Sequence, residues 1–132
     1  MENNRSCYKV ILVGDTDVGK TSIITYFDKK KFKDISMITI GETNTRKNLD
    51  LDNHRRIKLD IWDTPGEKKF RDVVKTSLHN ADGVILVYDI KSKDSFDSIK
   101  NYWYDEVKEN VRENTRKYRY NFIQYSHDIS RK

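Results

Sequence analysis

One loop constrains the fold of this chain more than any other feature. The sequence GDTDVGKT, from Gly14 to Thr21, follows the apolar run Val10 to Val13 and precedes a helix-periodic stretch. It fits G-x-x-x-x-G-K-[ST] at every fixed position and has the strand before and the helix after that the motif needs. Glycines let the backbone wrap an anion closely, and amide hydrogens at a helix N-terminus point at it. We therefore predict a phosphate-binding loop. The alternative is a glycine turn before an ordinary helix.

A second motif supplies the partner that such a loop needs. In this chemistry the lysine, Lys20, contacts the terminal phosphates and the Thr21 hydroxyl binds Mg²⁺. The sequence IWDTPG at 61–66 places Asp63 at the end of a buried strand, where its carboxylate can reach the Mg²⁺ shell. Gly66 can offer its backbone amide to a γ-phosphate. A lone D-x-x-G is a weak indicator because aspartate often ends strands, but the two motifs together predict a nucleotide site.

Strand and helix patterns alternate along the chain, which predicts one α/β domain with a mostly parallel sheet and helices on both faces. The expected strands are 10–13, 46–52, 56–62, 83–90 and 118–125, with the second and third joined as a hairpin. The expected helices are 22–29, 70–78 and one that begins at Ser95 as its N-cap. Apolar side chains predicted to face the core from the last two helices are Phe70, Val73, Val74, Leu78, Phe96, Ile99, Trp103 and Val107.

Composition excludes several classes of protein. The 132 residues carry a net charge of +5, but acidic residues are interspersed among the basic ones, so we expect no nucleic-acid partner. The single cysteine, Cys7, cannot form an internal disulfide and suits a reducing compartment. No stretch has the length of a signal core or a membrane span. The ending HDISRK offers no lipid anchor. We therefore expect a cytoplasmic protein.

The motifs and their order resemble those of Ras-superfamily small GTPases, closest to the Rab and Rho branches. KVILVGDTDVGKTSI, TIG at 39–41, IKLDIWDTPGEKKFR and ADGVILVYDIKSKDSF fall in family order at near-family spacing, and SFDSIKNYWYDEV is more similar to Rho proteins. The resemblance runs from about Tyr8 to Val111. It implies a P-loop NTPase G domain at 1–132 that lacks the family's last strand and helix, binds GTP or GDP with Mg²⁺, and acts as a switch.

The resemblance also implies roles for individual residues. Thr39 would join Thr21 and Asp63 as a metal ligand and would sense the γ-phosphate. Phe32 falls where the family places an aromatic against guanine. The alternative is that it is an ordinary hydrophobic anchor of a basic loop. The catalytic residues implied are Lys20, Gly66 and Glu67. The nucleotide-binding residues implied are Gly14, Asp15, Thr16, Asp17, Val18, Gly19, Lys20, Thr21, Ser22, Phe32, Thr39, Gly66 and Asp128.

Several positions depart from the family pattern. Glu67 stands where the family has the glutamine that orients the attacking water, so we expect slow hydrolysis. The alternative is that Glu67 is a solvated residue at the start of a helix. Pro65 replaces an alanine of the family, fixes φ and removes an amide. We expect it to stiffen the family's second switch, the segment whose hinge would be Gly66. Asp17 brings a negative charge near the phosphates unless its side chain points to solvent. Asn44 and Ser77 stand where Rab proteins place aromatic residues, with only Trp62 retained.

The chain contains no complete copy of the guanine-recognition motif N-K-x-D. Tyr125-Ser126-His127-Asp128 keeps only the aspartate and needs about four extra residues before it. An ungapped alignment instead puts Asn121 at the asparagine position, followed by Phe122, Ile123 and Gln124. Neither version is the motif. We therefore expect poor base selectivity, with nucleotide held chiefly through its phosphates.

Three functional hypotheses follow from these motifs. The first is a GTP/GDP switch with slow hydrolysis in signalling or vesicle trafficking, with effectors or regulators contacting 32–45 and 62–79. The second is a pseudo-GTPase that keeps the fold as a binding module. A third, weaker one is a P-loop kinase of small substrates, for which the chain shows no convincing lid or substrate arginines. We also expect self-association, because 118–125 would form an open sheet edge, or else a tail that covers the gap in a conformation unlike that of the family.

Overall fold

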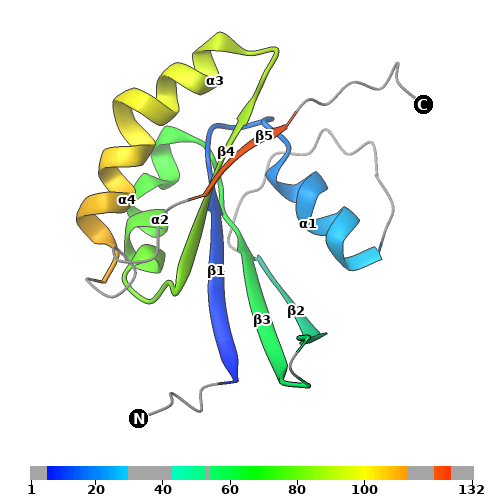
Figure 1. The fold of residues 1–132 in the computed structure, drawn as a ribbon. Helices are drawn as coiled ribbons and strands as arrows, with labels where there is room; N and C mark the ends of the chain where they lie inside the picture. Colours follow the sequence, from blue (N-terminus) through cyan, green and yellow to red (C-terminus); the bar gives the residue numbers. More distant parts are fainter. Residues whose placement is uncertain (1–5, 30–42, 53, 113–120, 126–132) are drawn as a thin grey trace.

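The computed structural model describes residues 6–29, 43–52, 54–112 and 121–125 (Figure 1). Strands and helices alternate as the sequence predicts. In chain order the elements are β1 (Cys7–Val13), α1 (Lys20–Lys29), β2 (Thr43–Asp50), β3 (Arg56–Asp63), the 3₁₀ turn η1 (Lys68–Phe70), α2 (Arg71–Leu78), β4 (Gly83–Asp89), α3 (Lys93–Ser98), the π-helical segment η2 (Ile99–Trp103), α4 (Tyr104–Asn110) and β5 (Asn121–Tyr125).

The sheet has the order β2-β3-β1-β4-β5. β1 is parallel to both of its neighbours, β3 and β4, and β4 is parallel to β5. β2 and β3 form the predicted antiparallel hairpin. The strand order reverses at β1. β2 and β3 lie on one side of β1, and the next strands along the chain, β4 and β5, lie on its other side. In open sheets of this kind, ligands bind beyond the carboxyl ends of the strands at such a switch point. The loop after β1 therefore lies where a ligand site is expected.

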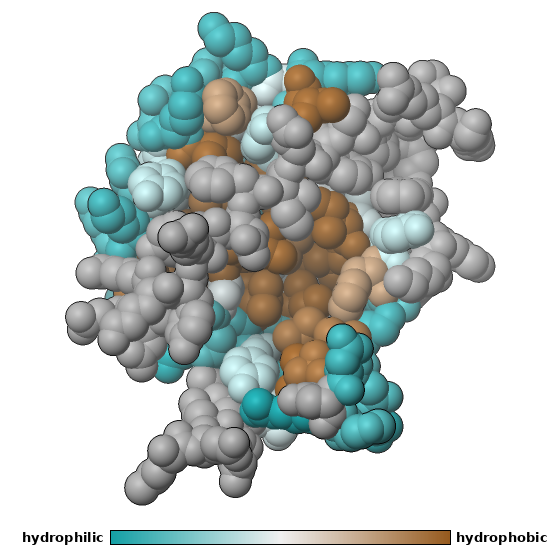
Figure 2. Space-filling model, viewed as in Figure 1, coloured by the Kyte–Doolittle hydropathy of each residue, from teal (hydrophilic) through white to brown (hydrophobic). Residues whose placement is uncertain are grey.

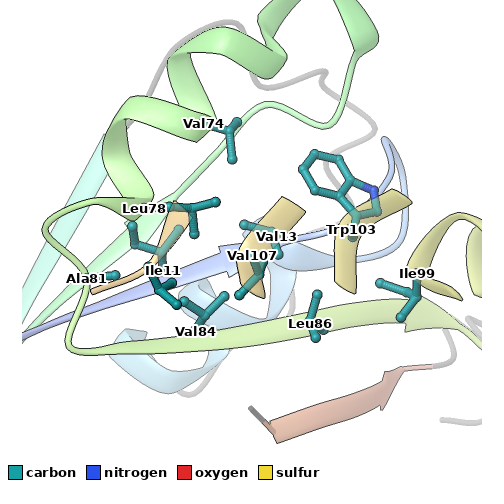
Figure 3. Close-up of a cluster of buried hydrophobic side chains, with 11 residues drawn as sticks. Ile11, Val13, Val74, Leu78, Ala81, Val84, Leu86, Ile99, Trp103 and Val107 are labelled. Atoms are coloured by element: carbon teal, nitrogen blue, oxygen red, sulfur yellow. The ribbon is translucent and has the colours of Figure 1, made fainter. Parts of the chain in front are cut away.

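Helices cover both faces of the sheet, as predicted, with α1 on one side and α2, α3 and α4 on the other (Figure 1). Alternate residues of β1 serve the two faces. Ile11 and Val13 belong to the larger apolar cluster, which α2, η2 and α4 complete and Figure 3 shows, whereas Leu12 belongs to the smaller cluster near α1. In the view of Figure 1, apolar side chains gather at the centre of the molecule with hydrophilic ones around them (Figure 2). This buried sheet is a rigid support for the loops at its edge.

The start of α3 differs from the prediction. The N-cap is Ser92, whose side-chain oxygen accepts a hydrogen bond from the Ser95 amide at 3.3 Å, so Ser95 is not the cap. Ser95 is buried instead, and its hydroxyl donates to the Ser92 carbonyl at 2.8 Å and accepts from the Asp89 amide at 3.0 Å. The helix therefore begins earlier, and a buried serine ties it to the end of β4.

Two of the predicted core residues are exposed. Val73 is 46% exposed because its neighbour Val74 takes the core-facing position of α2, and adjacent residues of a helix point about 100° apart. Phe96 is 38% exposed and lies against the Tyr88 ring, with ring centroids 4.9 Å apart. Leu78, Ile99, Trp103 and Val107 are buried, as predicted. Within the described residues, no helix is both long enough and apolar enough to cross a membrane.

Candidate functional site

The loop between β1 and α1 closes around the side chain of Lys20. This lysine is the first residue of α1 and is only 6% exposed. Its Nζ atom donates hydrogen bonds to the carbonyl oxygens of Gly14, at 2.9 Å, and Asp15, at 2.6 Å. The ammonium group therefore lies inside the curve of the loop, at the N-terminus of a helix. A phosphate held there meets both a fixed positive charge and the helix amides.

The electrostatic setting of Lys20 is unusual for a lysine. Burial lowers its pKa from 10.5 to about 8, while the carboxylates of Asp63, Asp15 and Asp17 act in the opposite direction. A pKa of about 8 keeps the side chain mostly protonated at neutral pH. The cation is thus retained but poorly solvated, which strengthens its attraction for an anion that enters the loop.

Thr21 and Asp63 come together from opposite sides of the loop. The Thr21 hydroxyl, on α1, donates to the Asp63 carboxylate, at the end of β3, over 2.5 Å. Asp63 is 4% exposed. A hydroxyl and a carboxylate are the hard oxygen donors that Mg²⁺ prefers, and Mg²⁺ in nucleotide sites takes its remaining ligands from water and phosphate. These two residues therefore fit a magnesium ion bound together with a nucleotide.

The segment after β3 packs directly against the loop. Thr64 is fully buried, and its hydroxyl donates to the Leu12 carbonyl at 2.7 Å, which anchors the segment to β1. At Gly66, a Cβ atom would lie 2.3 Å from the Thr16 amide nitrogen and 2.5 Å from the Asp15 carbonyl carbon. Only glycine allows this approach, because no side chain fits between the two backbones. The two motifs of the sequence thus meet as predicted.

Glu67 lies beside the same loop and forms an ion pair. Its carboxylate is 3.4 Å from the ammonium of Lys69, and its side chain is 27% exposed. Together with Asp15, Thr16 and Ser98 it lines an open groove of about 550 Å³, whose other lining residues are Gly66, Lys68, Lys69 and Arg71. The ion pair gives Glu67 a partner directly before η1. This arrangement fits the alternative interpretation of the sequence, in which Glu67 is a solvated residue at the start of a helix.

Asp17 has a strained backbone. Its φ is 65°, in the left-handed region, and its side chain is exposed. A residue with a Cβ atom pays roughly 1 kcal/mol for this conformation, and glycine does not. We expect Asp17→Gly to raise the free energy of unfolding by about 1 kcal/mol, seen as a higher midpoint in urea. Asp17→Ala also removes the charge but keeps a Cβ atom, so equal midpoints for the Ala and Gly variants would contradict the backbone explanation.

The surface predicted to contact partners has polar residues, Asn44 and Ser77, at the two positions where the resemblance implied aromatic ones. The Lys9 ammonium lies 4.7 Å from the centre of the Trp62 ring and donates to the Ser77 hydroxyl at 3.2 Å. The Asn44 side-chain amide and the Trp62 indole both donate hydrogen bonds to the Asp60 carboxylate, at 2.9 and 3.1 Å. Trp62 therefore contacts a cation and a carboxylate in addition to the larger apolar cluster, against which it packs. The sequence did not predict the contact with Lys9, because β1 and β3 first meet in the folded sheet.

Only part of the region expected to recognise the base lies within the described residues. Asn121 pairs with Ile85 at the start of β5, and Tyr125 pairs with Asp89 at its end. The family motif follows its strand, so the structure does not support the ungapped alignment through Asn121. Asp128 lies outside the described residues, as do Phe32 and Thr39. The described residues also contain no cluster of three or more His, Cys, Asp or Glu that could hold a metal.

Comparison with known proteins agrees with this arrangement. Residues 9–121 match the model of the Ras family. The chain is 40% identical to Rab-5B of Plasmodium falciparum over 102 residues, which are 77% of this chain and 49% of the relative. It is 36% identical to rab-39 of Caenorhabditis elegans over 104 residues, 79% and 45% of the two chains. For Rab-8A of Bos taurus the values are 38% over 104 residues, 79% and 49%. The chain thus spans about half the length of these relatives. The family match includes the phosphate loop, β3 with its terminal aspartate, and β4, and on this basis the chain belongs to the Ras family.

Proposed function

We propose that this protein is a small GTP- and GDP-binding switch with slow hydrolysis, similar in type to Rab proteins and acting in trafficking or signalling. The nucleotide binds beyond the carboxyl end of β1, with its phosphates in the loop 14–21. Lys20 and the α1 amides hold the phosphates, and Gly66 offers its amide to the γ-phosphate. When the γ-phosphate is present, the segment after β3 must take a position different from the one it has when packed against the loop.

The observation that carries this proposal is the position of the Lys20 ammonium. It is buried in the loop and donates hydrogen bonds to the neutral carbonyls of Gly14 and Asp15. A phosphate that enters replaces neutral acceptors with charged ones, and hydrogen bonds between charged groups are about twice as strong as neutral ones. The loop is thereby better suited to a phosphorylated ligand than to a neutral one.

Magnesium fits beside this phosphate site. Thr21 and Asp63 are the residues of the described chain that we assign to the ion, and Thr39 completes the predicted set. Bound Mg²⁺ neutralises charge on the β- and γ-phosphates. Asp63 also holds the Thr21 hydroxyl in place, so removing its carboxylate should weaken binding of nucleotide with Mg²⁺ more than binding without it.

Base selectivity should be poor because N-K-x-D is missing. A site that hydrogen-bonds a substrate group rejects analogues lacking it by about 10⁴-fold or more, and that discrimination is lost without the motif. We expect ATP to displace a fluorescent guanine nucleotide at concentrations no more than about a hundredfold above those of GTP. Complete exclusion of ATP in this competition would show that Asp128 or another group recognises guanine.

Hydrolysis should be slow because Glu67 stands where the family has the glutamine that orients water, and its carboxylate is paired with Lys69. We expect a single-turnover rate at or below about 10⁻⁴ s⁻¹ for the unaided protein. Glu67→Gln restores a neutral group able to orient water and should raise this rate. Lys69→Gln, which removes only the partner of Glu67, is the matched control. An unchanged rate in Glu67→Gln would show that Glu67 does not limit hydrolysis.

The remaining expectations concern partners and location. Effectors or regulators contacting 32–45 and 62–79 would meet Trp62 and the polar groups that contact it, described above. A cytoplasmic location and self-association through the segment that contains β5 stay predictions. β5 does lie at one end of the strand order, next to β4 alone among the described strands.

A further inference from the structure

Trp103 is a buried aromatic residue with a polar bond to the phosphate loop. Its side chain is 0% exposed and belongs to the larger apolar cluster, where Figure 3 shows its ring beside the aliphatic side chains. Its indole Nε1–H donates to the Asp15 carboxylate at 2.9 Å, across 88 positions of sequence. A buried indole needs such a partner, and a bond to a charged group is stronger than a bond to a neutral one. The loop is therefore attached to the hydrophobic core by one defined bond.

Asp15 also makes the contacts that shape the site. Its carbonyl oxygen accepts from the Lys20 ammonium at 2.6 Å. Its carbonyl carbon lies where a Cβ atom on Gly66 would come within 2.5 Å. The side chain of Asp15 thus points to Trp103 while its main chain faces Lys20 and Gly66. A rotation of Asp15 would move the acceptor of the phosphate-binding cation.

The neighbour of Trp103 contacts the segment after the second motif. The guanidinium carbon of Arg71 lies 3.4 Å from the centre of the Tyr102 ring and 5.6 Å from that of Trp103. Tyr102 and Trp103 meet edge to face with centroids 4.9 Å apart. Arg71 is the first residue of α2, directly after η1. Both aromatic residues lie on η2, a π-helical segment of the kind that often occurs at functional sites.

We propose that Trp103 is a positioning residue of the nucleotide site. Its N–H bond to Asp15 holds the phosphate loop in the form that binds nucleotide, and the adjoining Tyr102–Arg71 stack connects the same helix to the second switch. This inference rests on the proposed function, since it concerns how firmly a nucleotide is held. It assigns to η2 a role in nucleotide retention in addition to its role in the apolar core.

The test measures the rate at which a fluorescent GDP analogue leaves the protein. Trp103→Phe removes the indole N–H and should speed release about tenfold, as expected for loss of a hydrogen bond to a charged group. Asp15→Asn and Asp15→Ala both remove the charge, but only asparagine keeps an oxygen acceptor. We expect Asp15→Ala to release nucleotide about tenfold faster than Asp15→Asn. The double variant Trp103→Phe with Asp15→Ala should release at about the rate of the faster single variant, because the two residues share one bond.

Two controls separate this role from general stability and from the proposed function. Val107→Ala truncates another fully buried residue of the same cluster without touching the loop. It should lower the melting temperature but leave the release rate unchanged. The inference is overturned if Asp15→Ala and Asp15→Asn release nucleotide equally fast, or if the effects of Trp103→Phe and Asp15→Ala multiply in the double variant. A parent protein that binds no nucleotide would instead contradict the proposed function, before any variant is compared.

Discussion

Lys20→Met is expected to bind GDP and GTP at least about a hundredfold more weakly than the parent, because the ammonium supplies the charged bonds to phosphate. Methionine has an unbranched, flexible side chain one atom shorter than that of lysine, and it carries no charge. Isothermal titration with Mg²⁺ present measures the change. Lys108→Met, an exposed lysine of α4, is the matched control and should bind as the parent does. Parental affinity in Lys20→Met would show that the loop 14–21 is not the nucleotide site.

The same variant should remain folded without nucleotide. Burial lowers the pKa of Lys20 to about 8, so the buried charge itself is costly to the fold. Because the pKa of Lys20 is lower in the folded chain than in the unfolded chain, the protonated side chain lowers the free energy of unfolding at any pH below about 8, and an uncharged side chain avoids that cost. The melting temperature of nucleotide-free Lys20→Met should therefore equal or exceed that of the nucleotide-free parent. A much lower value would mean that the bonds to the Gly14 and Asp15 carbonyls outweigh the cost of burial.

Gly14→Ala should have the largest effect on stability. A Cβ atom at this position would lie 2.2 Å from the Val87 carbonyl oxygen, which is main chain of the interior strand β4. Neither backbone can move without breaking the sheet, so we expect a loss of about 3 kcal/mol or more and a melting temperature about 10 °C lower.

Gly83→Ala provides the comparison for that measurement. Gly83 also lies in β4, but its added Cβ would be 3.8 Å from the Val10 side chain, an ordinary contact. Circular dichroism during heating should show a nearly unchanged transition for Gly83→Ala. Similar transitions for the two variants would mean that β1 and β4 are less rigidly held at Gly14 than the structure indicates.

The elements with one strong pattern could be predicted from sequence. β1 and β4 contain the continuous apolar runs 10–13 and 84–87, which are typical of strands buried on both faces. The phosphate loop and Asp63 have fixed spacing within their motifs, and the parallel strands bring them together. Thr21 and Asp63 therefore meet where the sequence placed them.

The remaining features depend on choices that local patterns do not contain. Two serines near α3 both suit an N-cap, and only packing decides that Ser95 turns inward. Val73 and Val74 are both apolar, yet one face of α2 admits one of them. The bond from Trp103 to Asp15 joins residues 88 positions apart, and periodicity carries no information about such a pair. The left-handed backbone of Asp17 was not predicted, because the phosphate-loop motif leaves this position open to any residue.

The most direct test of the central claim is the nucleotide content of the freshly purified protein. The protein is denatured, and the released small molecules are identified and quantified by mass spectrometry beside an equal amount of Lys20→Met. Our account predicts nucleoside di- and triphosphates, guanine nucleotides among them, at a total close to one molecule per chain in the parent and almost none in the variant. A parent that carries no nucleotide and takes up none when GDP and Mg²⁺ are added would contradict the account and favour a pseudo-GTPase that acts as a binding module.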